Sequence, residues 1–260
     1  MALLADAGHN LSDVLGLLIA WGASVLSNRA PTARFTYGLR SSSILAALIN
    51  AVMLLIAVGA IAYEAISRLF TPEAVTGVTL IMVAAVGIVV NGVTAFLFSG
   101  GQKEDLNLRG TYLHMLADAA VSFGVVLAGL AILWTGWGWI DPVVSLVIAA
   151  VIVWGTWGLL RDSVNLALHA VPPGLDLEDV RRYLESLPGV SKIHDLHIWP
   201  MSTTETALTC HLVMPEGCRS DEFHTAASSA LAERLGIRHV TLQVEMGNGA
   251  PCALEPDHVV

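Results

Sequence analysis

Hydrophobic positions divide the chain into two parts. Up to Val171, apolar runs follow one another, each long enough to cross a bilayer as a helix of about 20 residues. Beyond Val171 these runs stop, and shorter amphipathic or alternating segments replace them. The apolar runs cover residues 1–27, 41–70, 75–99, 108–137 and 142–160. This pattern predicts a membrane α-helical bundle with five visible transmembrane helices, followed by a soluble domain.

The soluble part begins after Pro172 and Pro173, which interrupt the helical pattern. Asp176 and Ser220 are placed to cap two helices, and Gly236 is placed to end the second. The predicted elements are a helix over 177–187, strands over 191–199 and 204–214, a helix over 220–235 and a strand over 239–245. Their order favours helices layered on one sheet, an α+β domain. We expect a transmembrane domain over 1–171, a cytosolic domain over 172–246 and a mobile tail over 247–260.

Composition and charge support this division. The 260 residues are 55% hydrophobic and 13% charged, and a mean hydropathy of +0.67 indicates an integral membrane protein. Lysine and arginine gather in the first and third connections and after the fifth run, which by the positive-inside rule places these parts and the C-terminal domain in the cytoplasm. The net charge of −9 offers no basic face for nucleic acid. The three cysteines form no paired framework, which indicates a reducing compartment.

Two polar pairs interrupt the apolar runs. His9 and Asp13 lie in ADAGHNLSD, and His114 and Asp118 repeat the same spacing in YLHMLADAA. Residues i and i+4 share a helix face, so each pair presents an imidazole and a carboxylate to one point. Two such helices facing each other would supply two nitrogen and two oxygen ligands. That set suits Zn²⁺, and its oxygen ligands also admit Cd²⁺, Co²⁺, Fe²⁺ or Mn²⁺.

A structural role for these pairs is the alternative, because polar side chains also join helices inside membranes. An ionisable residue at the bilayer centre costs about 2.5–3.5 kcal/mol on insertion scales, however, and serine, threonine or asparagine would make such bonds more cheaply. The repeated spacing therefore favours a metal site. Asp6 lies three residues before His9. It is either near this site or a solvated carboxylate at the membrane surface.

The soluble domain is rich in histidine and ends its last strand with Glu245. The candidate ligands are His194, His197, His211, His224, His239 and Glu245, with Cys252 as a further possibility. Strand alternation places His211 on the face of Thr209, and His194 on the face of Leu196. As a group these residues predict a cytosolic metal site. The alternative is that they are ordinary surface histidines.

Several segments resemble the cation diffusion facilitator family, in its zinc-exporting branch with His-x-x-x-Asp in both metal helices. They are ADAGHNLSD, FTYGLRSSSILAALINA, YLHMLADA, DPVVSLVIAAVIVWGTWGLLRDSVNLALHAVP and IHDLHIW. The resemblance implies six transmembrane helices, then a cytosolic ferredoxin-like domain, in a homodimer that exchanges Zn²⁺ for protons. The visible helices then start at the second family helix, so the first is not represented. The third loop, GGQKEDLN, also lacks the histidine-rich tract of many members.

The resemblance also implies roles for individual residues. His9 and Asp13 fall on the second family helix, His114 and Asp118 fall on the fifth, and together they form the transport site. His194, His211, His239 and Glu245 fall where cytosolic metal ligands occur, and His224 is a further candidate.

The function predicted from the sequence is efflux of divalent cations, Zn²⁺ first, across the cytoplasmic membrane by proton antiport. Histidine and carboxylate must lose protons to hold a metal, so the two cargoes compete for one site. Two alternatives remain at this point. One is an intramembrane metalloenzyme, which the lack of a His-Glu-x-x-His motif disfavours. The other is a metal-sensing membrane protein that binds without transport.

Overall fold

The structure is a computed structural model that describes residues 18–71, 77–101, 105–217, 220–249 and 252–255. The chain forms two compact units. The first comprises Met1–Arg29 and Ser42–Val164, and the second comprises Ala30–Ser41 and Asn165–Val260. A membrane helical unit and a small α+β unit were both predicted, and this fold class is confirmed.

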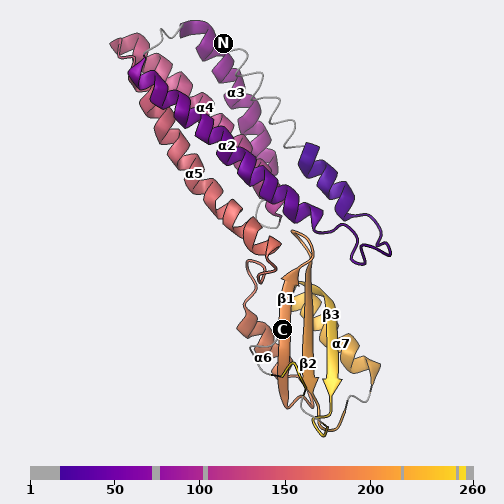
Figure 1. The fold of residues 1–260 in the computed structure, drawn as a ribbon. Coiled ribbons are helices and arrows are strands. Elements are labelled where there is room, and N and C mark those ends of the chain that lie inside the picture. Colours follow the sequence, from indigo (N-terminus) through magenta and orange to yellow (C-terminus); the bar gives the residue numbers. More distant parts are fainter. Residues whose placement is uncertain (1–17, 72–76, 102–104, 218–219, 250–251, 256–260) are drawn as a thin grey trace. The chain divides into compact units, whose positions relative to one another are not determined.

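The first unit is a set of long apolar helices (Figure 1). Its described helices are Leu18–Ser27, α2 (Ser42–Phe70), α3 (Gly77–Phe98), α4 (Leu106–Thr135) and α5 (Ile140–Ala167). Within the described residues, three stretches are long and apolar enough to span a membrane, namely Ser42–Phe70, Leu108–Thr135 and Ile140–Ala167. Leu18–Ser27 and Ala84–Phe98 are shorter apolar helices. The count of five spans therefore stays a prediction.

Small and branched side chains pack α2, α4 and α5 together. Leu54 and Val58 from α2 meet Ala117 from α4 and Ala149 and Ile152 from α5. Alanines at such an interface let the helix backbones approach closely, which gains dispersion energy where no hydrophobic effect operates. Because Ala117 is buried in this contact, the rotation of α4 about its axis is fixed at the turn that carries the predicted metal ligands.

Ion pairs tie both ends of α5 to its neighbours. Near its start, Asp141 accepts from Arg68 of α2 at 3.3 Å. Near its end, Asp162 accepts from Arg109 of α4 at 2.7 Å. Partly exposed ion pairs add little stability, about 0–1 kcal/mol. Their opposite positions along α5 instead set its register against α2 and α4.

A glycine of α4 faces side chains of α5. A Cβ atom placed on Gly124 would overlap Ile148 Cδ1 and would lie 3.2 Å from Val144 Cγ1, both on α5. By contrast, a Cβ atom on Gly92 of α3 would meet nothing within 4 Å. The contact at Gly124 therefore depends on the absence of a side chain.

We predict that Gly124→Val destabilises the purified protein by about 1–3 kcal/mol, the usual cost of overpacking. Gly92→Val is the matched control, because it places the same side chain in open space within a neighbouring helix. Thermal unfolding in detergent, followed by intrinsic tryptophan fluorescence, measures both. Equal effects of the two substitutions would contradict close packing of α4 on α5.

The second unit places two helices on one face of a three-stranded sheet (Figure 1). Its elements are α6 (Leu177–Glu185), β1 (Lys192–Pro200), β2 (Thr206–Val213), α7 (Asp221–Leu235) and β3 (Ile237–Glu245). β1 and β2 pair antiparallel, and β2 and β3 pair parallel. The predicted order of helices and strands is thus confirmed. The Asp176 side chain accepts from the Glu178 N–H at 2.9 Å, and Gly236 ends α7 with a φ of 71°.

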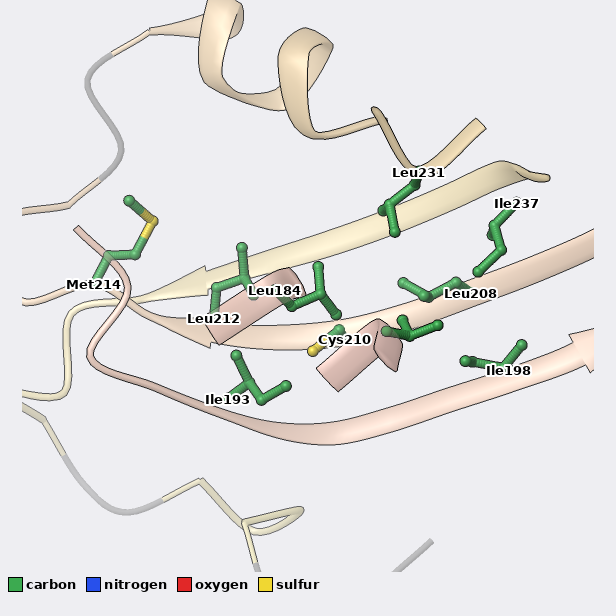
Figure 2. Close-up of a cluster of buried hydrophobic side chains, with 10 residues drawn as sticks. Leu184, Ile193, Ile198, Leu208, Cys210, Leu212, Met214, Leu231 and Ile237 are labelled. Atoms are coloured by element: carbon green, nitrogen blue, oxygen red, sulfur yellow. The ribbon is translucent and has the colours of Figure 1, made fainter. Parts of the chain in front are cut away.

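The core of this unit lies between the sheet and its two helices (Figure 2). Leu208, Cys210 and Leu212 alternate along β2 and are buried in this core, where α6 contributes Leu184 and α7 contributes Leu231. Because side chains alternate across a strand, the residues between them on β2, including His211, lie on the opposite face. That second face carries the polar chemistry of the unit.

A β-bulge interrupts β1 at its most polar stretch. His194 pairs with His211, but His197 pairs with Thr209, so β1 contains one residue more than β2 over this interval. Asp195 sits in the bulge with a φ of +49°. The extra residue of the bulge shifts the alternation of side chains along β1, so that both Ile193 and Leu196 pack on the core side of the sheet. The prediction that His194 shares a face with Leu196 is therefore wrong, because simple alternation cannot anticipate a bulge.

The connection that precedes α2 belongs to the second unit. Arg40 forms an ion pair with Glu205, and Ser41 Oγ donates to the Met201 carbonyl at 3.3 Å. Tyr37 packs edge-on against the His239 ring, with centroids 5.4 Å apart. This connection runs directly into α2 at Ser42.

Candidate metal sites

The first candidate site lies on α4, where His114 and Asp118 are one turn apart. His114 Nε2 is 3.5 Å from Asp118 Oδ2, and the two side chains are only 14% and 5% exposed. Both residues lie within the stretch Leu108–Thr135, which is apolar enough to span a membrane. The helix thus holds an imidazole and a carboxylate close together on one face, as their spacing predicted.

The other predicted members of this site lie outside the described residues. His9, Asp13 and Asp6 all fall within residues 1–17. The meeting of the two His-x-x-x-Asp pairs therefore remains a prediction.

An amide from α2 lies on the same stripe of α4 as His114. A Cβ atom on Gly110, one turn before His114, would lie 2.6 Å from Asn50 Nδ2. Asn50 therefore places a polar group of α2 one helical turn from the pair on α4.

The second candidate site lies on the open face of the sheet in the soluble unit. It combines His194, His211, Glu245 and Cys252, whose potential ligand atoms all lie within 4.8 Å of one another. His194 and His211 are buried, and the other two are partly exposed. We call this group the cytosolic cluster.

Strand register builds the cytosolic cluster. His194 and His211 face each other across β1 and β2, with ring centroids 4.9 Å apart. Glu245, the last residue of β3, lies between the two rings. Its Oε2 is 3.0 Å from His194 Nε2, and its Oε1 is 2.9 Å from His211 Nδ1. Cys252 Sγ lies 3.7 Å from the same His211 Nδ1.

The hydrogen bonds in the cluster favour a charged Glu245 carboxylate. Burial opposes the charge, but bonds from His194, Gln243 and Cys252 outweigh it and lower the pKa of Glu245 below its usual range. Cys210 behaves differently. Burial in the core raises the pKa of its thiol to about 12, so it stays protonated at neutral pH and cannot serve as a thiolate ligand.

The donor set of the cytosolic cluster fits a transition metal such as Zn²⁺. Imidazole, carboxylate and thiolate are the ligands that Zn²⁺ takes in tetrahedral sites. The Nε2 of His194 and the Nδ1 of His211 already point at one carboxylate, and a metal ion would replace the protons shared there. The residues present therefore suffice for a site made within one chain.

Two predicted cytosolic ligands lie away from the cluster. His239 pairs with Ala207 and precedes Glu245 by six residues on β3, a separation of about 20 Å at strand rise. His224 lies on α7, and its neighbour Phe223 packs against the core on the other side of the sheet. The structure does not bring either residue to the cluster, and their roles as ligands stay predictions.

Sequence reasoning missed Asp195 and gave Cys252 only as a possibility. Asp195 lies 2.9 Å from His197 Nε2 through Oδ1 and 3.4 Å from His211 Nε2 through Oδ2. The tail, expected to be mobile, contacts the sheet in its described part through Cys252, and Glu255 accepts from Lys192 at 2.8 Å. The His-Asp-x-His order around Asp195 was the one available signal for it.

Family models match both units of the chain. Residues 1–166 match the cation efflux transmembrane domain, and residues 172–246 match the cytoplasmic domain of cation efflux proteins. The chain belongs to the cation efflux family. The family expected from the sequence is thereby confirmed, and this chain is a membrane transporter of metal cations with a cytoplasmic domain, not an enzyme.

Curated relatives of this chain are named for transport of divalent metals. The cadmium, cobalt and zinc/H⁺-K⁺ antiporter of Bacillus subtilis is 36% identical over 94% of this chain and 80% of its own length. The metal cation efflux system protein CzcD of Cupriavidus metallidurans is 35% identical over 97% and 79%. The zinc transporter ZitB of Escherichia coli is 36% identical over 94% and 79%. A solved structure titled the metal-bound C-terminal domain of the Cupriavidus CzcD transporter is 36% identical over 27% of this chain and 99% of that one, with a TM-score of 0.24.

We predict that Co²⁺ bound to the purified full-length protein gives a thiolate-to-metal charge-transfer band, because Cys252 Sγ lies among the potential ligand atoms of the cluster. Cys252→Ser should abolish the band, whereas Cys210→Ala and Cys218→Ser, which remove the other two thiols, should leave it. Near-ultraviolet absorption during Co²⁺ titration measures this. Persistence of the full band in Cys252→Ser would exclude Cys252 from the site.

Proposed function

We propose that this cation efflux protein exports Zn²⁺ in exchange for protons at a site formed by His9, Asp13, His114 and Asp118. The observation that carries the proposal is the pair on α4, with His114 Nε2 3.5 Å from the buried Asp118 Oδ2 inside an apolar helix. His9 and Asp13 join it through the identical spacing in ADAGHNLSD. The names of the relatives, which include zinc transporters and an antiporter, support this cargo and this coupling.

Competition between metal and protons couples the two flows. Imidazole and carboxylate bind Zn²⁺ only after losing their protons, so metal arriving from the neutral cytosol releases protons from the pair. On the side where protons are abundant, protonation of the same groups releases the metal. If helices move around a fixed site to open it to each side in turn, a proton gradient drives export.

The domains divide this work in the proposal. Residues 1–171 form the translocation path. Residues 172–246 bind metal in the cytosol through His194, His211 and Glu245, and the tail over 247–260 adds Cys252. The cytosolic domain also carries dimer contacts, which accords with the family model matched there. Metal bound by this domain favours one packing of a homodimer, since a ligand shifts an equilibrium by its differential affinity for the two states.

We predict that His114→Ala and Asp118→Asn each abolish Zn²⁺ flux, at least 100-fold below wild type, while the protein still folds. Neither pair alone supplies four ligands, so the loss of one ligand leaves an incomplete site. Zn²⁺ uptake into proteoliposomes under an imposed pH gradient measures this. Leu116→Ala is the control, because Leu116 lies on the exposed side of the same helix turn.

Flux at the wild-type rate in either site variant, at equal protein content, would remove the site assignment. Metal binding by the wild-type protein without any flux would instead favour a sensor over a transporter.

We predict that His9→Asp raises the transport rate of Cd²⁺ relative to Zn²⁺, because it replaces an imidazole nitrogen with a carboxylate oxygen. Parallel uptake assays with each metal give the ratio. An unchanged ratio would show that the ligands at this position do not select the ion.

We predict that His211→Ala lowers the apparent Zn²⁺ affinity or rate of transport several-fold without abolishing flux, because the translocation path does not include the cytosolic cluster. His169→Asn, which changes an exposed histidine at the end of α5, is the control. The same proteoliposome assay over a range of Zn²⁺ concentrations measures it. Complete loss of flux in His211→Ala would contradict a purely regulatory role.

A further inference from the structure

Asp195 contacts the cytosolic cluster but is not one of its four potential ligands. The side chain is 11% exposed, and its two oxygens face two different histidines. Oδ1 is 2.9 Å from Nε2 of His197, a residue whose side chain is 42% exposed. Oδ2 is 3.4 Å from Nε2 of the buried His211. His197 therefore holds one oxygen of the carboxylate and leaves the other directed at His211.

The two ring nitrogens of His211 point at different partners. Nδ1 lies 2.9 Å from Glu245 Oε1 and 3.7 Å from Cys252 Sγ, so it faces the cluster. Nε2 faces Asp195. When a metal takes Nδ1, the remaining proton of a neutral ring sits on Nε2 and needs an acceptor. Asp195 is the carboxylate at that position.

The backbone explains why an aspartate reaches this point. Asp195 occupies the β-bulge with a φ of +49°, where the extra residue reverses the alternation of β1. Aspartate and asparagine adopt this left-handed conformation more readily than other side chains, and glycine adopts it freely. The bulge therefore turns a short carboxylate toward the histidine face of the sheet.

His194 supplies an internal comparison. Its Nε2 faces Glu245, and its Nδ1 is buried without a hydrogen-bond partner among the residues that the structure describes. Within the described part of the chain, His211 is the one of the two imidazoles with a carboxylate on the side away from the cluster. A carboxylate behind a metal-bound histidine fixes the ring orientation and tautomer and makes the nitrogen a stronger donor.

We propose that Asp195 is a positioning residue of the cytosolic metal centre, whose carboxylate accepts the Nε2 proton of His211 and so directs Nδ1 at the metal. The inference rests on the proposed binding of metal by the cytosolic cluster, and it adds a residue that contacts no metal itself. His197 belongs to the same chain of contacts, because it orients Asp195. Loss of such a carboxylate typically weakens metal binding about 10- to 100-fold.

The test is a Co²⁺ titration of the full-length protein, followed by the charge-transfer band from Cys252. A transmembrane site made of histidine and aspartate has no sulfur ligand and would not contribute to this band. Asp195→Asn keeps the shape and the preferred backbone conformation but removes the charge. We expect its midpoint to rise about 10- to 100-fold, with an unchanged band shape. Asp179→Asn, the same substitution on the exposed side of α6, should leave the midpoint unchanged.

A second measurement separates positioning from general support of the fold. In histidine-selective ¹⁵N spectra of the Zn²⁺-loaded protein, Asp195→Asn should move the Nε2 resonance of His211 and leave that of His194 in place. The unfolding temperature of the metal-free protein should not change. Asp195→Gly, which suits a positive φ, repeats both measurements if Asp195→Asn folds poorly.

An unchanged Co²⁺ midpoint in both Asp195 variants would overturn the inference. Movement of both histidine resonances together with a lower unfolding temperature would also overturn it, because that combination indicates a structural role. Absence of the charge-transfer band in the wild-type protein would contradict the metal centre itself, and the inference with it. Transport of Zn²⁺ by His114 and Asp118 does not depend on any of these outcomes.

Discussion

Two ionisable side chains inside an apolar helix impose the main constraint on the transmembrane unit. An aspartate at the bilayer centre costs about 2.5–3.5 kcal/mol on insertion scales, so it needs a compensating partner. His114 and Asp118 lie 3.5 Å apart, Asp118 is buried and His114 is largely covered, while the packing of α2, α4 and α5 around Ala117 fixes the helix that carries them. In the proposed mechanism, a proton or a metal ion balances the charge of the pair, and only one of them can occupy the same lone pairs at a time.

The soluble unit applies the same chemistry on a different scaffold. Its sheet holds Glu245 between two imidazoles, and the tail adds the thiol of Cys252. A sulfur atom among the potential ligands distinguishes this cluster from the pair on α4, which offers only an imidazole and a carboxylate. The connection over Ala30–Ser41 belongs to this unit and continues into α2 at Ser42. Metal binding in the cytosol thus has a covalent route to a helix of the bundle.

Periodic features of the structure were predictable, and interruptions of periodicity were not. The spacing of His114 and Asp118 follows from helix geometry, and the caps at Asp176 and Gly236 follow from local backbone preferences. The pairing of His194 with His211 required the register of β1 on β2, which a bulge alters by one residue. Cys252 joins the cluster from the tail that follows β3, and Asp195 joins it through a positive φ. Neither the contact of the tail with the cluster nor the backbone conformation of Asp195 produces a repeating pattern in the sequence.

Exchange of protons for metal at the α4 pair is the central claim, and proton release on Zn²⁺ binding tests it most directly. Zn²⁺ is added to lightly buffered detergent solutions of the purified protein at neutral pH, and a pH indicator counts the protons released. The background is His211→Ala with Cys252→Ser, which disables the cytosolic cluster. We expect proton release in this background and its loss when His114→Ala and Asp118→Asn are added. Equal release with and without His114 and Asp118 would contradict the account.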